Sequence, residues 1–499
     1  MNLKIISYFL GWVLKIESIA FALSGIVSVW AGDTYWYWLF ILAVVVFGIG
    51  VFMSPKRFSL GTFYSREGYA ATALGWLVLS LVGAVPFVIT GKIPNYIDAV
   101  FEIASGFTTT GASILDEVEH LGKGLLFFRS FSHWVGGMGV LVLILAILPF
   151  GGTGNHMQLM KAESPGPQVS KLVPRVRETA LVLYGIYIVL TLIMVVTYLI
   201  AGMPLFDALC IGFGTAGTGG FTVRNTGMED YSNLAIVFSS IWMFLFAVNF
   251  NVYYLVLNKK WKDALKSEEL RAYTGMVLIA VLLIFAALTI RELRTPVITY
   301  YDHTNLVPSY GANFREAFFT VTSTVSSTGF TLPVLYKFGG LSRYVVILLM
   351  IIGACGGSTG GGLKVSRVVI LIKSAGREIH MLMHPNSVKL LKFEGKTLDN
   401  NTARSVSNYL MIFVLVFAIS LFIVLADPNV NSFTQGFTSV LTCINNIGPC
   451  FGENGEWICS LSHYNWLSKL VLTFDMIAGR LEFLPMLLLF NPKTWKKTY

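Results

Sequence analysis

Thr108-Thr109-Thr110-Gly111-Ala112 is the first of four short polar segments on which the fold prediction for this chain depends. Each follows a short amphipathic stretch and lies between two long apolar runs, and we call the four the turn segments. The other three are Ala216-Gly217-Thr218-Gly219-Gly220, Ser326-Ser327-Thr328-Gly329-Phe330 and Asn445-Asn446-Ile447-Gly448-Pro449. Aligned on Gly111, Gly219, Gly329 and Gly448, they are separated by 108, 110 and 119 residues. This period is too long for a solenoid unit and predicts a repeated helix–pore loop–helix module.

A second marker precedes each turn segment at a nearly constant distance. A small residue lies 12, 11, 12 and 12 positions before the aligned glycine, at Ala99, Ala208, Ala317 and Gly436. An acidic or amide residue comes immediately before it, at Asp98, Asp207, Glu316 and Gln435. One such segment is a weak signal, since Gly and Thr are common in turns. Four in a shared register favour a repeated module over four unrelated polar turns.

Glycine in such a turn has a physical use in a cation pore. Removing water from K⁺ requires a replacement shell of oxygen atoms, which rings of backbone carbonyls supply. Carbonyls point into a pore only when the chain adopts dihedral angles that glycine reaches at little cost. A helix that ends at the turn also directs the negative end of its dipole at the cation. The four turn segments are therefore predicted to form one ring of carbonyls within a single chain.

The composition places the chain in a bilayer. Of its 499 residues, 55% are hydrophobic and 13% are charged, and the mean hydropathy is +0.68. Uncharged runs long enough to cross the hydrocarbon core occur at 34–55, 71–90, 179–206, 231–258, 272–290, 344–363 and 405–426. The predicted fold is an all-α polytopic membrane protein with four pseudo-symmetric helix–pore loop–helix repeats around one pore. An extra N-terminal helix pair precedes them.

Other functional classes find little support. The 36 Lys and Arg exceed the 27 Asp and Glu, but no basic stripe with interleaved aromatic residues indicates nucleic acid. Five cysteines match no metal-ligand spacing, although Cys450 and Cys459 could pair in one outer loop. No Ser/His/Asp set or nucleotide loop stands out. We therefore predict no enzyme and no cofactor on this chain itself.

The predicted organisation follows the four turn segments. Ten spanning and four half-spanning helices are expected, with the N-terminal pair at 5–32 and 34–54 and the first pore helix at 96–107. A second helix of the first repeat is expected at 125–149. The predicted domains are an N-terminal pair, a first, second and third repeat, a cytoplasmic linker and a fourth repeat with a basic tail, at 1–66, 67–150, 151–260, 261–375, 376–403 and 404–499.

Charged loops predict the orientation of the chain in the membrane. Loops between repeats and the tail are basic and are expected in the cytoplasm: Lys161, Lys171, Arg175, Lys259, Lys260, Lys262, Lys266, Arg271, Lys373, Arg377, Lys389, Lys392, Lys396, Lys493, Lys496 and Lys497. Loops after the turn segments are acidic and are expected at the outer mouth: Asp116, Glu117, Glu119, Glu229, Asp230, Glu453 and Glu456. In the cytoplasmic linker, Val388, Leu390 and Phe393 around Glu394-Gly395 predict a short hairpin.

A glycine-rich stretch interrupts the second helix of the third repeat. We call residues 353–362 the glycine loop: Gly353, Ala354, Cys355, Gly356, Gly357, Ser358, Thr359, Gly360, Gly361 and Gly362. Irregular backbone within a membrane is tolerated where it lines a cavity or is buried in protein. A gate beneath the turn segments is the favoured hypothesis, and close helix packing is the alternative. A phosphate loop does not fit, because Leu363 precedes Lys364 where that motif has Gly-Lys-Ser/Thr.

Three charged residues, Asp475, Arg480 and Glu482, lie in the second helix of the fourth repeat. Charges at this depth are costly and face a cavity or a partner. Arg480 is predicted to project beneath the turn segments as a barrier to K⁺, and an ion pair with Glu482 or Asp475 is the alternative. Lys364 and Arg367 are expected at the cytoplasmic boundary. Arg129 either extends to the interface or fixes a pore helix.

Five motifs along the whole chain resemble the TrkH-type subunit of the bacterial Trk/Ktr/HKT potassium transporter superfamily. They are Gly106-Phe107-Thr108-Thr109-Thr110-Gly111-Ala112, Ser132-His133-Trp134-Val135-Gly136-Gly137-Met138-Gly139, Gly362-Leu363-Lys364-Val365, His384-Pro385-Asn386 and Gly479-Arg480-Leu481-Glu482. The N-terminal helix pair is also similar to TrkH and not to KtrB. The resemblance implies K⁺ uptake across the bacterial inner membrane by a homodimer with one pore per protomer.

The resemblance also implies partners and site residues. A cytosolic TrkA-type subunit would bind nucleotide, ATP or ADP and NAD, in place of this chain. Glycine at position 111 goes with K⁺ selectivity in the family. The implied selectivity filter is Thr109, Thr110, Gly111, Gly217, Thr218, Gly219, Ser327, Thr328, Gly329, Asn446, Ile447 and Gly448. The implied gate is Gly353, Gly356, Gly357, Ser358, Thr359, Gly360, Gly361, Gly362 and Arg480. A symporter coupled to H⁺ or Na⁺ on the same scaffold is the alternative function.

Overall fold

The computed structural model describes residues 3–55, 65–139, 176–294, 310–332, 338–387, 389–452 and 456–495. Several predicted features lie outside these ranges: residues 140–149 of the expected second helix, and Lys161, Lys171, Arg175, Val388, Glu453, Lys496 and Lys497. The protein is an all-α membrane protein, as the sequence predicts. Within the described residues, six helices are long and apolar enough to span a bilayer, or seven if one bent pair counts as a single span.

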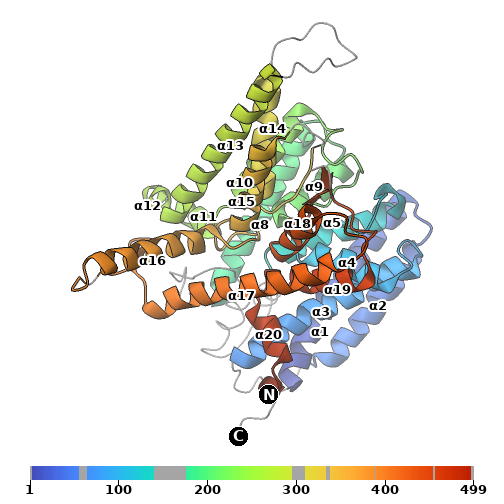
Figure 1. Ribbon diagram of the computed structural model, residues 1–499. Coiled ribbons are helices and arrows are strands. Elements are labelled where there is room, and N and C mark those ends of the chain that lie inside the picture. The colour runs from blue at the N-terminus through green and yellow to red at the C-terminus, as the bar shows by residue number, and fades with distance from the viewer. Residues whose placement is uncertain are drawn as a thin grey trace.

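The helices follow the predicted order along the chain (Figure 1). The first half contains α1 (Leu3–Ala31), α2 (Trp36–Met53), α3 (Ser65–Ile89), α4 (Tyr96–Phe107), η1 (Glu119–Leu121), α5 (Lys123–Gly137), α8 (Val176–Ile200), α9 (Leu205–Gly217), α10 (Asn233–Phe246) and α11 (Phe250–Leu257). The second half contains α12 (Trp261–Lys266), α13 (Glu268–Arg294), α14 (Tyr310–Val325), α15 (Gly340–Ile352), α16 (Val365–Met383), α17 (Asn400–Leu425), α18 (Phe433–Ile444), α19 (Trp466–Arg480), α20 (Leu484–Phe490) and α21 (Pro492–Trp495).

Two small antiparallel hairpins complete the secondary structure. One joins β1 (Lys392–Phe393) to β2 (Lys396–Thr397), and the other joins β3 (Cys450–Phe451) to β4 (Trp457–Ile458). The first confirms the hairpin that the sequence predicts around Glu394-Gly395. Its two turn residues have φ of 52° and 71°, the left-handed pair that a two-residue hairpin turn requires.

The N-terminal helices α1 and α2 form the expected pair. They contact each other closely at Gly11 and Gly50, where a Cβ on either residue would lie 2.7 Å from the carbonyl oxygen of the other. Small residues at a helix–helix contact allow this approach inside a membrane. Helix α1 packs in turn against α3 and α5, so the pair is attached to the side of the first set of helices.

A short helix precedes each turn segment, and a further helix follows it. The short helices are α4, α9, α14 and α18, and the helices that follow are α5, α10, α15 and α19. Each following helix packs against the next short helix: α5 on α9, α10 on α14, α15 on α18, and α19 back on α4. The contacts therefore close into a circle, in which the helices around the fourth turn segment meet those around the first.

Within the described residues, three of the helices that follow the turn segments are interrupted, and the expected total of ten spanning helices stays a prediction. Helices α10 and α11 are bent by 89° across residues 247–249. Helix α15 ends at the glycine loop, where Gly353 has a φ of 72°. Helix α19 ends at Arg480, and Glu482 and Phe483 then adopt positive φ. The interruptions lie inside the protein, where neighbouring groups replace the lost helix hydrogen bonds.

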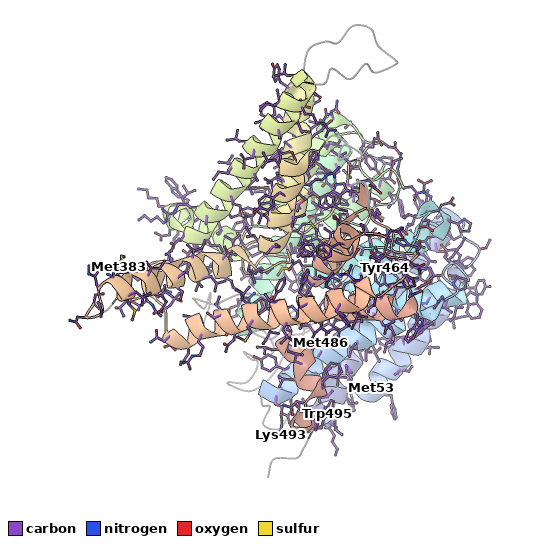
Figure 2. The ribbon with its side chains drawn as sticks, in the orientation of Figure 1. Met53, Met383, Tyr464, Met486, Lys493 and Trp495 are labelled. Carbon is purple, nitrogen blue, oxygen red and sulfur yellow. The ribbon has the colours of Figure 1, made fainter. Side chains whose placement is uncertain are left out.

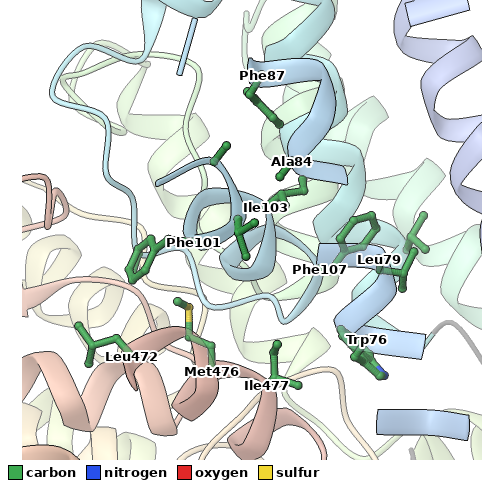
Figure 3. Packing of buried hydrophobic residues seen from close by; sticks show 14 of the residues in the cluster. Trp76, Leu79, Ala84, Phe87, Phe101, Ile103, Phe107, Leu472, Met476 and Ile477 are labelled. Carbon is green, nitrogen blue, oxygen red and sulfur yellow. The ribbon is translucent and has the colours of Figure 1, made fainter. Parts of the chain in front are cut away.

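The core between the first and last helix sets is apolar and tightly packed. Figure 3 shows Phe101 and Ile103 of α4 facing Leu472, Met476 and Ile477 of α19. All five side chains are at most 1% exposed. By contrast, the outer face of α17 carries exposed Met411 and Phe422, and side chains project outward along its length (Figure 2). Helix α17 is therefore apolar both on the face that packs in the core and on the face that is exposed, as expected for a helix in contact with lipid.

Candidate functional site

The four turn segments share one backbone conformation. A residue other than glycine has a left-handed φ of 55°, 57°, 56° and 53° at Thr109, Thr218, Ser327 and Asn446. Two residues later, φ is 83°, 79°, 79° and 109° at Gly111, Gly220, Gly329 and Gly448. Left-handed residues other than glycine are uncommon in proteins. Their recurrence at one position of all four segments shows that the segments are structurally equivalent.

Backbone hydrogen bonds give the same alignment. The amide between the two left-handed residues donates to the carbonyl five positions earlier, at the end of the short helix. The four pairs are Thr110 to Ser105 (2.9 Å), Gly219 to Gly214 (2.7 Å), Thr328 to Ser323 (3.0 Å) and Ile447 to Thr442 (2.9 Å). Each turn is thus fastened to its own short helix, and that helix ends directly at the turn.

The second turn segment lies one residue later than the sequence alignment places it. Gly220, not Gly219, is the backbone equivalent of Gly111, and Gly217 is the last residue of α9. With this correction the spacings between the glycines become 109, 109 and 119 residues. Ala208 then precedes its glycine by 12 positions, as in the other three copies. The sequence did carry a sign of this shift, because the distance of 11 from Ala208 to Gly219 differs from the 12 found in the other copies. The shift was missed because two adjacent glycines, Gly219 and Gly220, both fit the pattern.

The turn segments contact one another in chain order and close a ring. A Cβ built on a glycine of one segment would lie under 3.0 Å from a carbonyl oxygen of the next. The glycine and carbonyl pairs are Gly111 with Gly219, Gly220 with Thr328, Gly329 with Ile447, and Gly448 with Thr110. No larger residue fits at these four positions without displacing a neighbouring carbonyl. The ring therefore brings the backbone oxygens of four distant segments together.

A buried ion pair holds the first segment in place. Arg129 of α5 and Glu102 of α4 lie 2.5 Å apart, and both side chains are almost fully buried. Glu102 also accepts hydrogen bonds from the Ser113 hydroxyl and the Ile114 amide, just after the turn. Arg129 reaches the carbonyl of Thr222 at 3.1 Å, after the second turn. Of the two roles considered for Arg129, the structure supports the fixing of a short helix.

Two further side chains join neighbouring segments. His133 of α5 contacts the Gly106 carbonyl through Nδ1 at 2.7 Å, and its Nε2 accepts the Phe221 amide at 3.3 Å. This pattern fits a neutral ring that donates from Nδ1. Asn446 donates from Nδ2 to the Thr110 hydroxyl at 2.9 Å. The asparagine of the fourth segment therefore ties the ring between its last and first members.

The glycine loop packs against the third and fourth turn segments. A Cβ on Gly360 would lie 2.6 Å from the Ser326 carbonyl, and one on Gly361 would collide with the Asn445 carbonyl. The Gly361 amide also donates to the Ser327 hydroxyl. On its other side, the loop fills the bend between α10 and α11, where the Cys355 amide donates to the Ala247 carbonyl at 3.1 Å. The glycines are needed because backbone surrounds the loop on two sides.

Arg480 connects the glycine loop to α5. Its guanidinium donates to the Thr359 carbonyl at 2.8 Å and to the carbonyls of Gly136 and Gly137, both at 2.6 Å. Glu482, one partner considered from the sequence, pairs with Arg367 at 2.6 Å. The other, Asp475, accepts from the Ser420 hydroxyl at 2.8 Å. Arg480 therefore places a positive charge between the loop and the opposite helix.

Lys364 and Arg367, expected at the cytoplasmic boundary, are buried side chains. They are 2% and 5% exposed, respectively. The Lys364 ammonium donates to the Gly360 carbonyl, and the Arg367 guanidinium stacks on the Tyr409 ring at 3.9 Å. Both charges are thus held inside the protein directly after the glycine loop, and their place at the cytoplasmic boundary stays a prediction.

The comparison with known families agrees with this architecture. The model of the TrkH family, described as a cation transport protein, matches residues 40–497. The chain belongs to the TrkH family. A TrkH-family Trk system potassium uptake protein from Salmonella typhimurium (strain LT2) is 34% identical over 452 residues, 89% of each chain. The TrkH protein of Halomonas elongata is 32% identical over 507 residues and covers all of both chains.

A solved structure extends the likeness to the TrkH fold. The crystal structure of the potassium transporter TrkH from Vibrio parahaemolyticus matches with a TM-score of 0.85 and 28% identity, over 99% of this chain and 100% of that one. The predicted resemblance is confirmed. Because the TrkH family consists of transport proteins, the expectation that the chain is not an enzyme is also confirmed.

Some acidic residues of the loops expected at the outer mouth of this TrkH-family chain have local partners. Asp116 accepts hydrogen bonds from the Ser460 and Ser462 hydroxyls, so it joins the loops after the first and fourth turn segments. Among the described residues, no group of three or more His, Cys, Asp or Glu side chains is placed to hold a metal ion. Cys450 and Cys459, whose pairing the sequence left open, are both free thiols.

Proposed function

We propose that this protein takes up potassium through a pore whose selective part is the ring of turn segments. The observation that supports this most strongly is the closed ring of four equivalent left-handed turns, each with a glycine against the carbonyl of the next. Such a ring supplies oxygen atoms in place of the water around a dehydrated cation. The printed names of the relatives, potassium uptake proteins of the Trk system, favour K⁺ as the cation.

The proposed K⁺ site takes three consecutive residues from each turn segment. Its members are Thr109, Thr110, Gly111, Thr218, Gly219, Gly220, Ser327, Thr328, Gly329, Asn446, Ile447 and Gly448. A short helix ends at each set of three: α4, α9, α14 and α18. The negative ends of four helix dipoles therefore face the ring. The three residues from the fourth turn segment include no Thr or Ser, and the Asn446 side-chain amide donates its hydrogen bond to Thr110.

The proposed gate consists of the glycine loop and Arg480. The loop lies against two of the four turn segments, and Arg480 ties it to the opposite helix through carbonyl contacts. A fixed positive charge at this place opposes the passage of a cation. Opening then requires the loop to leave Arg480, which the carbonyls of α5 hold in place.

The proposed setting is the bacterial inner membrane, with the basic loops in the cytoplasm. A homodimer with one pore per protomer, controlled by a cytosolic TrkA-type subunit, follows from the family resemblance. Nucleotide, whether ATP, ADP or NAD, acts in this proposal on that subunit. This chain then contributes only the pore and the gate.

Reversal potentials of the purified protein in planar lipid bilayers test the proposal. Under opposed K⁺ and Na⁺ gradients, the current is expected to reverse near the Nernst potential of K⁺. Reversal near the Na⁺ potential, or a current without preference between the two ions, would overturn the selective pore. A reversal potential that shifts with an H⁺ or Na⁺ gradient would instead favour the coupled symporter.

A further inference from the structure

Glu269 in the first turn of α13 binds both the glycine loop and the helix that follows it, α16. Its side chain is buried, and its Oε1 accepts the Gly356 amide at 2.6 Å and the Ser366 amide at 3.1 Å. Its Oε2 accepts Nδ2 of Asn249, in the bend between α10 and α11, at 3.2 Å. Hydrogen bonds to a carboxylate are stronger than those between neutral groups. One side chain therefore fixes Gly356 of the loop, the first turn of α16 and the helix bend that receives the loop.

The hairpin that β1 and β2 form in turn fixes the first turn of α13. Glu394, at the tip of the hairpin, accepts hydrogen bonds from the Ser267 hydroxyl and the Glu269 amide, both at 2.9 Å. A carboxylate at this place satisfies a free helix amide and faces the positive end of the helix dipole. The backbone of Glu269 is thus bound by the hairpin while its side chain binds the glycine loop.

The hairpin also rests on the two helices that follow the glycine loop. Phe393 and Leu391 are buried against Ile370 of α16 and Val406 of α17. Lys373 of α16 donates to the Lys392 carbonyl at 2.9 Å. Helix α16 begins directly after the loop and projects from the body of the molecule, with Met383 at its far end (Figure 2). A displacement of α16 would therefore pull on the hairpin and on the end of the loop together.

We propose that Glu269 and Glu394 are positioning residues that hold the glycine loop in place, with the hairpin as the element that sets their position. The inference rests on the proposed function only in taking the loop as the obstruction to K⁺. The physical basis is the unbroken set of contacts from Phe393 and Glu394 to Glu269, and from Glu269 to Gly356 and Ser366. The path links the glycine loop and the first turn of α16 to the hairpin of the linker.

Cys355 gives a direct measure of the loop that does not depend on transport. It lies in the glycine loop and is 0% exposed, and Cys210 and Cys443 are equally buried elsewhere. The full-length protein in liposomes is treated with N-ethylmaleimide, and modification of each cysteine is followed by peptide mass spectrometry. K⁺ flux is measured on the same liposomes. The variants are Glu269→Ala, Glu394→Ala, their combination, and Glu269→Gln, which keeps an oxygen acceptor.

We expect Glu269→Ala and Glu394→Ala each to raise the Cys355 modification rate at least tenfold and to raise K⁺ flux. In the combined variant, Cys355 is expected to react no faster than in Glu269→Ala, because both residues act on one path. In Glu269→Gln, the Cys355 modification rate is expected to return toward that of the parent protein. The control is Glu378→Gln, at a carboxylate of α16 that is 62% exposed. Its Cys355 modification rate and its K⁺ flux should stay within twofold of the parent protein's.

Three results would overturn this inference. A Cys355 rate within twofold of the parent in Glu269→Ala would exclude the clamp on the loop. The same rate in Glu394→Ala would exclude the hairpin. Equal acceleration at Cys443 and Cys210 would indicate general loosening in place of a role in positioning. Faster Cys355 modification without increased K⁺ flux would uphold the positioning role and count against the loop as the gate of the proposed pore.

Discussion

At the scale of single residues, the turn segments depend on backbone angles that most side chains avoid. Thr109, Thr218 and Ser327 adopt left-handed angles that cost a residue other than glycine roughly 1–2 kcal/mol. Hydrogen bonds to the short helices and contacts with neighbouring segments offset this cost. Strain held by its surroundings in this way is typical of functional sites.

Gly220 should therefore be as sensitive to substitution as Gly111. In Gly220→Ser, the new Cβ would collide with the Thr328 carbonyl and displace an oxygen of the ring. We expect the K⁺/Na⁺ permeability ratio from bilayer reversal potentials to fall about tenfold, equivalent to about 1.4 kcal/mol. Gly185→Ser on α8 is the control, because nothing lies within 4 Å of a Cβ there. An unchanged ratio in a normally expressed Gly220→Ser protein would place Gly220 outside the selective ring.

At the scale of elements, the interrupted helices and the glycine loop fit each other. The bend between α10 and α11 leaves the Ala247 carbonyl and the Phe250 amide without helix partners, and Cys355 and Gly357 of the loop supply them. Backbone groups inside a membrane must be satisfied by protein or by water in a cavity. A bent helix and a loop are therefore stable together where either alone would be costly.

Deletion of residues 356–361 tests the element as a whole. If the loop obstructs the path, its removal should raise K⁺ flux into liposomes at least about tenfold, as expected when a gate is lost. Arg480→Gln should raise flux by a smaller factor, because the loop then loses one of its attachments. A fall in flux for both variants, at normal expression, would favour a packing role for the loop.

At the scale of the whole molecule, the ring must close between helices that are distant in sequence. The Ser113 amide donates to the Cys459 carbonyl at 3.0 Å, and the Leu461 amide donates back to the Ser113 carbonyl at 2.7 Å. Lys469 of α19 pairs with Asp98 of α4 at 2.7 Å. These contacts join the loops and helices of the first and last sets. The ring is thus closed by contacts between the helices around the first and the fourth turn segments.

The pair between Asp98 and Lys469 should stabilise this closure measurably. Its side chains are 22% and 7% exposed, so solvent screens the pair only in part. We expect a double-mutant cycle with Asp98→Asn and Lys469→Met to give a coupling of about 1–2 kcal/mol in the free energy of unfolding in sodium dodecyl sulfate. Arg377 and Glu378, an exposed pair within α16, should give less than about 0.5 kcal/mol. Equal couplings would deny the first pair any special part in closing the ring.

The sequence by itself determined the elements and most of the turn positions, because these depend on neighbouring residues. The first short helix was expected at 96–107 and spans Tyr96–Phe107, with Asn95 accepting a cap hydrogen bond from the Ile97 amide. The hairpin at Glu394-Gly395 was likewise predicted from turn chemistry. Apolar run length indicated the N-terminal pair. In each case the signal and the structure lie within the same few residues.

Only the tertiary structure decided the register of Gly220, the bend between α10 and α11 and the partners of the buried charges. Gly217, Gly219 and Gly220 are alike in sequence, and the groups that surround them, the His133 carbonyl and ring and the Thr328 carbonyl, come from distant parts of the chain. Arg480 reaches Gly136, 344 positions away, and Glu394 reaches Ser267, 127 positions away. No local pattern records such distances, because the partner is chosen by how the helices pack around the ring.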